Sequence, residues 1–240
     1  MLCPGCGAEM THIDLDARLG ATLTIDLCAG CKAIWFDRFE DLQMAPAATL
    51  KVFGIISDQS TAASAPLPGV LRCPRCSARL QHTHDIQRNT PFRYWRCDGG
   101  HGRLMTFIDF LRQKDFVRPL SAQQLHELRQ NVQTINCSNC GASVDLANDS
   151  VCRHCGSAVS MLDLQQMTRT IAQLQAAAAG RRPADPAAAA PSAGNGTSSV
   201  SPEDLDALIQ AIRSRHHEEP EPSLISTGLR MLGDLLRKRF

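Results

Sequence analysis

The stretches Cys3-Pro4-Gly5-Cys6 and Cys28-Ala29-Gly30-Cys31 frame the first part of this sequence and decide how it folds. A Cys-x-x-Cys turn delivers two thiolates to one cation from a single tight loop. The same pair recurs as Cys73-Pro74-Arg75-Cys76, and again at 137–140 and 152–155. Five such pairs in 240 residues, of which only 5% are aromatic, predict several small modules rather than one large core.

The eleven cysteines indicate metal ligation rather than disulfides, because an odd number would leave one thiol over. The chain shows neither a secretory leader nor an apolar run long enough for a membrane span, so we expect a cytoplasmic protein with reduced thiols. Zinc takes four tetrahedral ligands, and the cysteines plus one histidine supply three such sets. The predicted ligands of three Zn²⁺ ions per chain are Cys3, Cys6, Cys28 and Cys31, then Cys73, Cys76, Cys97 and His101, then Cys137, Cys140, Cys152 and Cys155.

The fourth ligand of the middle site depends on His101. Glycines 99, 100 and 102 surround this histidine and permit the turn that would bring its imidazole back to the ion. His82 and His84, on a predicted strand, are the alternatives. A site closed by neither would keep an open position for water, which is the one route to zinc catalysis in this chain.

Alternating apolar residues predict two strands between the first two Cys-x-x-Cys turns, followed by a strand at 33–36 and a short helix opened by Asp37 and Glu40. The fold class is therefore small metal-stabilised α+β modules: zinc ribbons joined by helices. We expect a first ribbon with a short helix over 1–45, a linker over 46–69, a second ribbon with a helix over 70–118, a connecting helix over 119–135, a third ribbon over 136–160, a helix over 161–179, a disordered linker over 180–200 and amphipathic helices over 201–240.

Charge divides these modules. Residues 1–45 carry seven acidic and three basic groups, whereas residues 72–118 carry ten basic and four acidic groups. Cations interleaved with aromatic rings on a hairpin are typical of single-stranded nucleic-acid binding, and equally of a solvated β-face. The nucleic-acid hypothesis rests on Arg93, Tyr94, Trp95, Arg96 and Arg103.

The first 45 residues resemble the bacterial transcription-factor-IIB-type zinc-ribbon family. The resemblance is carried by Cys3-Pro4-Gly5-Cys6-Gly7, Ile25-Asp26, Cys28-Ala29-Gly30-Cys31 and Ile34-Trp35-Phe36-Asp37 leading to Glu40. Ala33 and Phe39 stand where that family usually has glycine, and Asp41 separates Glu40 from Leu42. The resemblance implies a ribbon fold and zinc binding, and the other two modules are ribbon-like only generically.

We therefore expect a non-enzymatic zinc protein that acts as a protein–protein adaptor, in transcription or RNA-related processes. Its partner would be another protein, bound through the ribbons or through residues 201–240. One alternative is nucleic-acid binding through residues 72–118. A second is electron transfer by iron in the third site, whose Cys-x-x-Cys-Gly turns resemble those of rubredoxins. The sequence names neither the partner nor an oligomeric state.

Overall fold

The structure is a computed structural model that describes most of the first two thirds of the chain. The described residues are 1–59, 67–87, 90–163, 166, 168–169, 172–173, 176–177, 205–207, 209–210 and 224–225. The disordered linker expected at 180–200 and most of the tail lie outside them.

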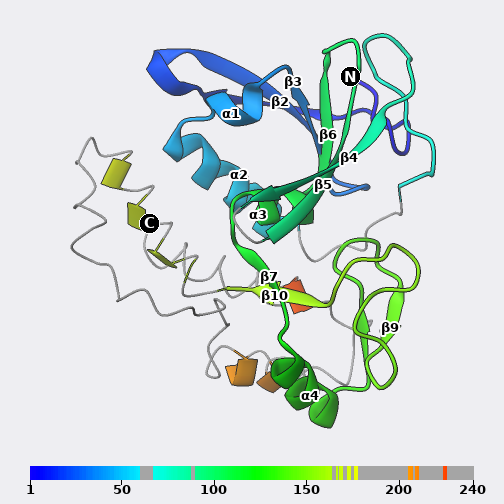
Figure 1. The fold of residues 1–240 in the computed structure, drawn as a ribbon. Helices are drawn as coiled ribbons and strands as arrows, with labels where there is room; N and C mark the ends of the chain where they lie inside the picture. The colour runs from blue at the N-terminus through cyan, green and yellow to red at the C-terminus, as the bar shows by residue number, and fades with distance from the viewer. Residues whose placement is uncertain are drawn as a thin grey trace.

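Six antiparallel strands form the main sheet, in the order β1-β2-β3-β6-β5-β4 (Figure 1). The strands are β1 (Thr11–Asp16), β2 (Thr22–Cys28), β3 (Ala33–Asp37), β4 (Gln81–Gln87), β5 (Thr90–Arg96) and β6 (Gly102–Thr106). The first three belong to what we call the first half (residues 1–59), and the last three to the second half (residues 67–116). The two halves were expected as separate modules. Instead, β3 pairs with β6 and joins them into one sheet.

The seam between β3 and β6 is tightly packed. It runs from the pair Ala33–Thr106 to the pair Asp37–Gly102. A Cβ at Gly102 would come within 2.3 Å of the Phe36 carbonyl oxygen, and the backbone φ there is +146°. Only glycine therefore fits where β6 begins against β3.

Side chains of the seam alternate between two cores, as the strand period requires. Phe36 and Met105 point into the helix-side core, which also contains Val52, Phe53 and Phe110. The opposite face forms the metal-side core, in which Trp35 and Leu104 pack with the cysteines of the first two clusters. Both faces of β3 are thus covered, which explains why the run Ala33–Phe36 is apolar throughout.

Two helices build the helix-side core. Pro46–Asp58, expected as part of a linker, forms helix α2 instead, with Pro46 in its first turn and Val52, Phe53 and Ile56 buried. Helix α3 (Phe107–Gln113) begins after Thr106, whose hydroxyl accepts a hydrogen bond from the Asp109 amide. The helix ends at Gln113, and Asp115 just beyond it adopts a left-handed conformation with φ +66°.

The short helix of the first half, α1 (Glu40–Gln43), starts later than the sequence indicated. Asp37 was expected to cap it, but Arg38 and Phe39 form a turn before the helix begins. The carboxylate of Glu40 still accepts a hydrogen bond from the Asp37 amide at 2.8 Å. Half of the predicted capping arrangement is therefore present.

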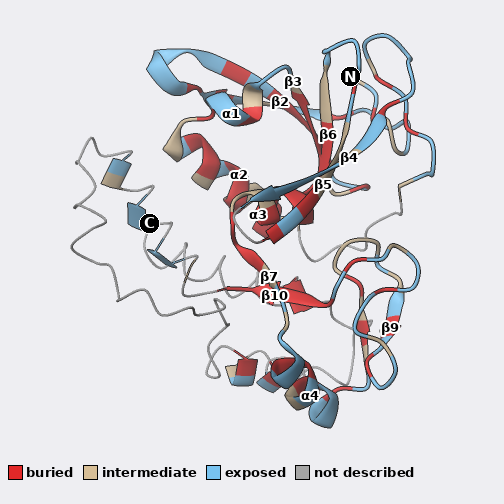
Figure 2. Cartoon of the chain, viewed as in Figure 1, coloured by how far each residue is buried: buried red, intermediate tan, exposed pale blue. Residues whose placement is uncertain are grey.

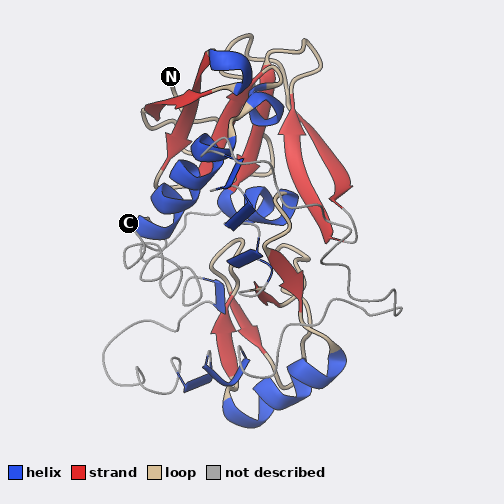
Figure 3. Ribbon diagram, turned by 90° about the vertical axis from the view of Figure 1, so that its left-hand side faces the viewer, coloured by secondary structure: helices blue, strands red, loops and turns tan. Residues whose placement is uncertain are grey.

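The remaining elements form a smaller third region (residues 117–163), which lies below the sheet in Figure 3. They are β7 (Val117–Pro119), α4 (Ala122–Asn131), β8 (Thr134–Asn136), β9 (Ser143–Asp145) and β10 (Ser160–Leu162). The connecting helix expected within 119–135 is present as α4, and Ser121 and Gln124 form a capping box at its start. β7 pairs with β10, and β8 pairs with β9. The helix expected from residue 161 gives way to β10 at its start, and those residues from 166 to 177 that are described are helical.

Four apolar residues of the tail are buried against the chain itself. Leu205, Ile209 and Leu224 belong to the core of the third region, and Ile225 belongs to the helix-side core. These apolar side chains were expected to serve a partner protein, but at these positions they complete the fold. No helix within the described ranges is long and apolar enough to cross a membrane.

Candidate metal centres

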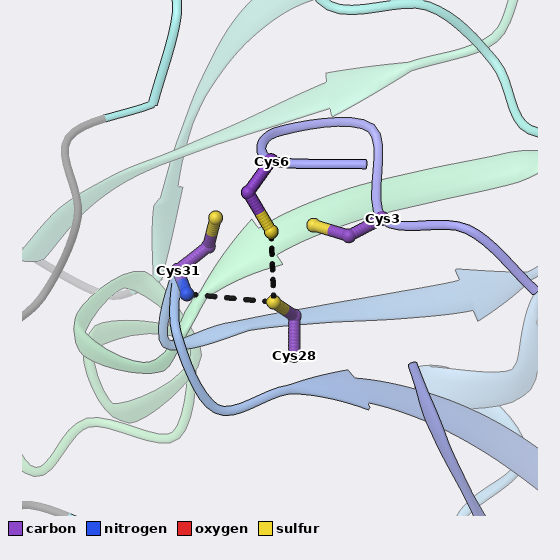
Figure 4. A group of neighbouring side chains, drawn as sticks. All are labelled: Cys3, Cys6, Cys28 and Cys31. Carbon is purple, nitrogen blue, oxygen red and sulfur yellow. Dashed lines mark hydrogen bonds between the residues drawn. The ribbon is translucent and has the colours of Figure 1, made fainter. Parts of the chain in front are cut away.

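The first candidate metal centre joins two loops of the first half (Figure 4). Cys3 and Cys6 come from the N-terminal turn, and Cys28 and Cys31 come from the turn between β2 and β3. All four sulfur atoms lie within 4.8 Å of one another, and Cys6 and Cys28 are 3.6 Å apart. Backbone amides of Gly5 and Cys31 donate hydrogen bonds to the sulfur atoms of Cys3 and Cys28.

The second centre repeats this arrangement in the second half with a histidine in one position. Cys73, Cys76 and Cys97 gather with His101, whose Nδ1 atom lies 3.4 Å from the Cys97 sulfur and 3.9 Å from the Cys73 sulfur. A Cβ at Gly99 would lie 3.1 Å from the His101 ring, so glycine lets the loop close tightly around the imidazole. His101 is thus the histidine that the fold brings to the three thiols.

His82 and His84 lie away from this cluster, on the exposed edge strand β4. The His82 ring stacks on Trp95 at 4.9 Å and meets the His84 ring edge-on at 4.6 Å. Burial, helped by the nearby His84 and Arg93, lowers the pKa of His82. Neither histidine takes part in the second centre.

The third centre lies between the two turns of the third region. Cys137, Cys140, Cys152 and Cys155 also hold their sulfur atoms within 4.8 Å of one another. Cys137 lies 3.6 Å from Cys155, and Cys140 lies 3.7 Å from Cys152. The strand pair β8–β9 leads into this cluster. Each of the three clusters brings together cysteines that are distant in the sequence, as their spacing predicted.

The chemistry of the donors fits a thiophilic cation. Burial raises the pKa of Cys3, Cys73 and Cys140 to about 11, because ionised thiols are costly to bury without a counter-ion. Burial also acts to raise the pKa of Cys97, but hydrogen bonds from the His101 amide and imidazole outweigh it and lower the pKa to about 6. Crowded thiols with no described disulfide partner are what a metal requires, since its charge allows all of them to ionise together.

The five residues of the nucleic-acid hypothesis do not share one open face. Arg93 donates hydrogen bonds to the Cys155 carbonyl at 3.0 Å and to the Ser157 hydroxyl at 2.6 Å. Trp95 points to the same face as Arg93 and packs on His82, whereas Tyr94 points the other way and is half-buried. Arg96 alone is well exposed, with its guanidinium 3.7 Å from Asp98.

Arg103, the fifth of these residues, forms an ion pair across the seam. Its guanidinium binds the carboxylate of Asp41, which is fully buried and also accepts a hydrogen bond from Gln113 at 2.9 Å. Asp41 belongs to the first half, and both of its partners belong to the second. The sequence analysis did not predict this ion pair, because nothing in the residues next to Asp41 indicates that its partner is Arg103.

Comparison of the chain with protein-family models, with curated proteins and with solved structures gives no significant match. The function proposed below therefore rests on the geometry of the chain itself.

Proposed function

We propose that this protein is a zinc-built scaffold, without catalytic activity, that docks another protein. The observation that carries the proposal is that each cluster offers four donors. Four donors fill the tetrahedral shell of Zn²⁺ and leave no position for water or substrate. Zinc in such sites stabilises the fold, with roughly 10–16 kcal/mol available per site in small peptides at neutral pH.

The same geometry supports a zinc ribbon in each half of the sheet. It is also compatible with the transcription-factor-IIB-type resemblance of residues 1–45. Each half places two ligand-bearing loops at the end of an antiparallel hairpin with a third strand beside it. Trp35 adds a specific contact, because its indole N–H donates to the Asp37 carboxylate at 2.8 Å. The role in transcription that the family name suggests is itself a proposal.

Metal content is the first test. Elemental analysis of the purified full chain should give three zinc ions per chain, and the protein should be colourless. A red protein containing iron would instead favour electron transfer at the third centre. Fewer than three metal ions at saturation would contradict the proposed ligand sets.

Nucleic-acid binding is the second candidate, and the exposed guanidinium of Arg96 is the observation that favours it. A salt-dependent gel shift with a single-stranded oligonucleotide tests it on the full chain. Arg96→Ser is the informative variant, because Arg93 holds the third region and its loss would disturb the fold. Absence of a shift at low salt would remove this candidate.

Affinity capture tests the adaptor role itself. The zinc-loaded full chain should retain the same protein partner after nuclease treatment, in stoichiometric amount, and should release it after chelation. Loss of the partner on nuclease treatment would favour nucleic acid as the ligand. The described apolar residues of the tail are buried, so deletion of residues 201–240 would test folding rather than docking.

A further inference from the structure

Large apolar side chains are exposed together on one side of the first half. Leu19 is fully exposed, and Phe39 and Leu42 are 54% and 58% exposed. Ala17 bridges to Met44, which holds the turn Arg18–Gly20 beside α1 (Figure 1). We call Arg18, Leu19, Arg38, Phe39 and Leu42 the α1 surface.

Two of these residues occupy unfavourable backbone conformations. Leu19 has φ +64° and Phe39 has φ +65°, in the left-handed region that bulky L-residues avoid. Glycine or asparagine would relieve the conflict in both places. Leu19 gains no burial in return, and Phe39 gains little. Strain without a packing benefit is what a surface kept for binding shows.

Two hollows flank Leu42 and give an incoming chain somewhere to insert side chains. The first has a volume of about 230 Å³ and is lined by Phe53 and Phe116, with Arg18 and Lys114 also in its wall. The second has a volume of about 470 Å³ and is lined by Phe39, Tyr94 and Arg96, among others. Both hollows combine apolar and aromatic residues with cations and with the carboxylates of Asp37, Asp41 and Asp98. Each of these carboxylates lies within 4.0 Å of an arginine, so the walls suit the mixed side chains of a protein segment.

The charge of the α1 surface is positive. Neither Arg18 nor Arg38 lies within 4.0 Å of a carboxylate among the described residues. The nearby acids are already bound, Asp37 by Arg75 at 2.6 Å and Asp41 by Arg103. Burial and the neighbouring Arg103 and Arg18 lower the pKa of Lys114 to about 8, in keeping with a positive local field.

We propose that the α1 surface docks an acidic segment of a partner protein, with apolar side chains seated around Leu42 and carboxylates at Arg18 and Arg38. The inference rests on the proposed adaptor function and gives it a site and a partner chemistry. Acidic rather than basic segments fit because Arg18 and Arg38, neither of which meets a described carboxylate, border the apolar residues, with the Arg38 guanidinium 5.0 Å from the centre of the Phe39 ring. The partner's apolar side chains, seated in the hollows, supply most of the affinity. The exposed charges of Arg18 and Arg38 attract the acidic segment and orient it as it approaches.

The test begins with a phage-displayed library of random peptides selected on the zinc-loaded full chain. Enriched peptides should combine Asp or Glu with Leu, Phe or Trp. Their binding, measured by fluorescence anisotropy, should weaken about tenfold or more in the Leu19→Asn/Phe39→Asn double variant. Because asparagine tolerates the left-handed region, the melting temperature of this variant should equal or exceed that of the wild type.

A matched control separates this surface from exposed apolar and basic residues in general. Ile86→Ser/Arg79→Ser removes an exposed isoleucine and an exposed arginine from the second half, and should leave peptide binding unchanged. Binding to the wild type should also weaken with added salt, because the rim contacts are exposed ion pairs.

Other outcomes would overturn the inference in different ways. Acidic peptides that bind the double variant as tightly as the wild type would place docking elsewhere and leave the adaptor function standing. Enrichment of basic peptides, or of none, would contradict the partner chemistry. Binding of an oligonucleotide that is lost in the double variant would identify nucleic acid as the occupant. Self-association seen by light scattering and lost in the double variant would identify a second copy of the chain.

Discussion

The two halves of the sheet share one scaffold but fill it differently. Cys3 corresponds to Cys73 and Cys28 to Cys97, and the strands between them follow the same order. Where the first half places Leu27, buried at 1% exposure, the second half places the exposed Arg96. Where the first half buries Ile34 completely, the second half has Arg103.

This difference shows in the exposure of the strands. The first hairpin buries Leu15, Leu23 and Ile25 under α2, whereas almost all of β4 is exposed (Figure 2). Hydrophobic burial is the main source of stability in most folds, and small units that lack it depend on metals. We infer that the metal matters more to the second half than to the first.

The largest expected effect comes from removing one ligand in each half. Cys28→Ser and Cys97→Ser should each lower the metal content by one, since structural zinc contributes on the order of 10 kcal/mol. In Cys97→Ser the amides of β4 and β5 should exchange with solvent rapidly. In Cys28→Ser the amides of β1 and β2 should keep partial protection, because aliphatic packing remains. Hydrogen exchange followed by mass spectrometry measures both, and equal loss of protection would break the comparison.

The buried ion pair across the seam should give the next largest effect. Asp41→Ala leaves the Arg103 guanidinium, whose side chain is only 19% exposed, without its carboxylate, which costs about 3 kcal/mol. Urea denaturation of the metal-loaded chain measures this loss. Asp41→Leu/Arg103→Met replaces both charges with apolar groups and should recover most of it. A double variant as unstable as Asp41→Ala would show that the pair does more than compensate charge.

Corresponding positions on the two edge strands sharpen the comparison further. Leu15→Ala opens a cavity in the helix-side core and should cost about 2–5 kcal/mol. Asp85→Ala, at the matching position of β4, should change the free energy of unfolding by no more than about 0.5 kcal/mol. Similar costs for the two variants in urea denaturation would mean that β4 is covered in solution.

The smallest effect is a pH dependence at Lys114, which hydrogen-bonds the Asp41 carbonyl across the halves at 3.4 Å. Its folded pKa of about 8 lies below the ordinary 10.5, so the unfolded chain binds the proton more tightly. Stability from this group is therefore lost below pH 8 and regained as pH rises toward 10.5. Lys114→Met should be more stable than the wild type at neutral pH, with the difference shrinking in alkali. Lys51→Met, on the exposed side of α2, is the control.

Local features of the fold could be read from the sequence, because their causes are local. Cys-x-x-Cys turns, the glycines around His101 and the Ser121 capping box each specify structure within a few residues. Strand alternation likewise predicted the first hairpin.

Features that depend on distant partners could not be read in the same way. The pairing of β3 with β6 joins residues that are some 70 positions apart, and α2 looked like a linker because alanine and proline dominate its start. Arg93 looked like a nucleic-acid contact because its partner, the Cys155 carbonyl, is a backbone atom of another module. The strands repeat along with the Cys-x-x-Cys turns, so the position of β6 could have been predicted from that of β3.

The seam between β3 and β6 also decides where this chain can be divided. A cut within residues 60–66 would separate the halves at a point that looks convenient in the sequence, yet β3 and β6 would then each become an edge strand with one side open. Open strands of this kind recruit other chains, so fragments ending there should associate or precipitate rather than behave as free modules. For anyone preparing truncated versions of the protein, residues 1–116 keep every strand of the sheet with its neighbour and retain α2 and α3, which cover one face of the sheet.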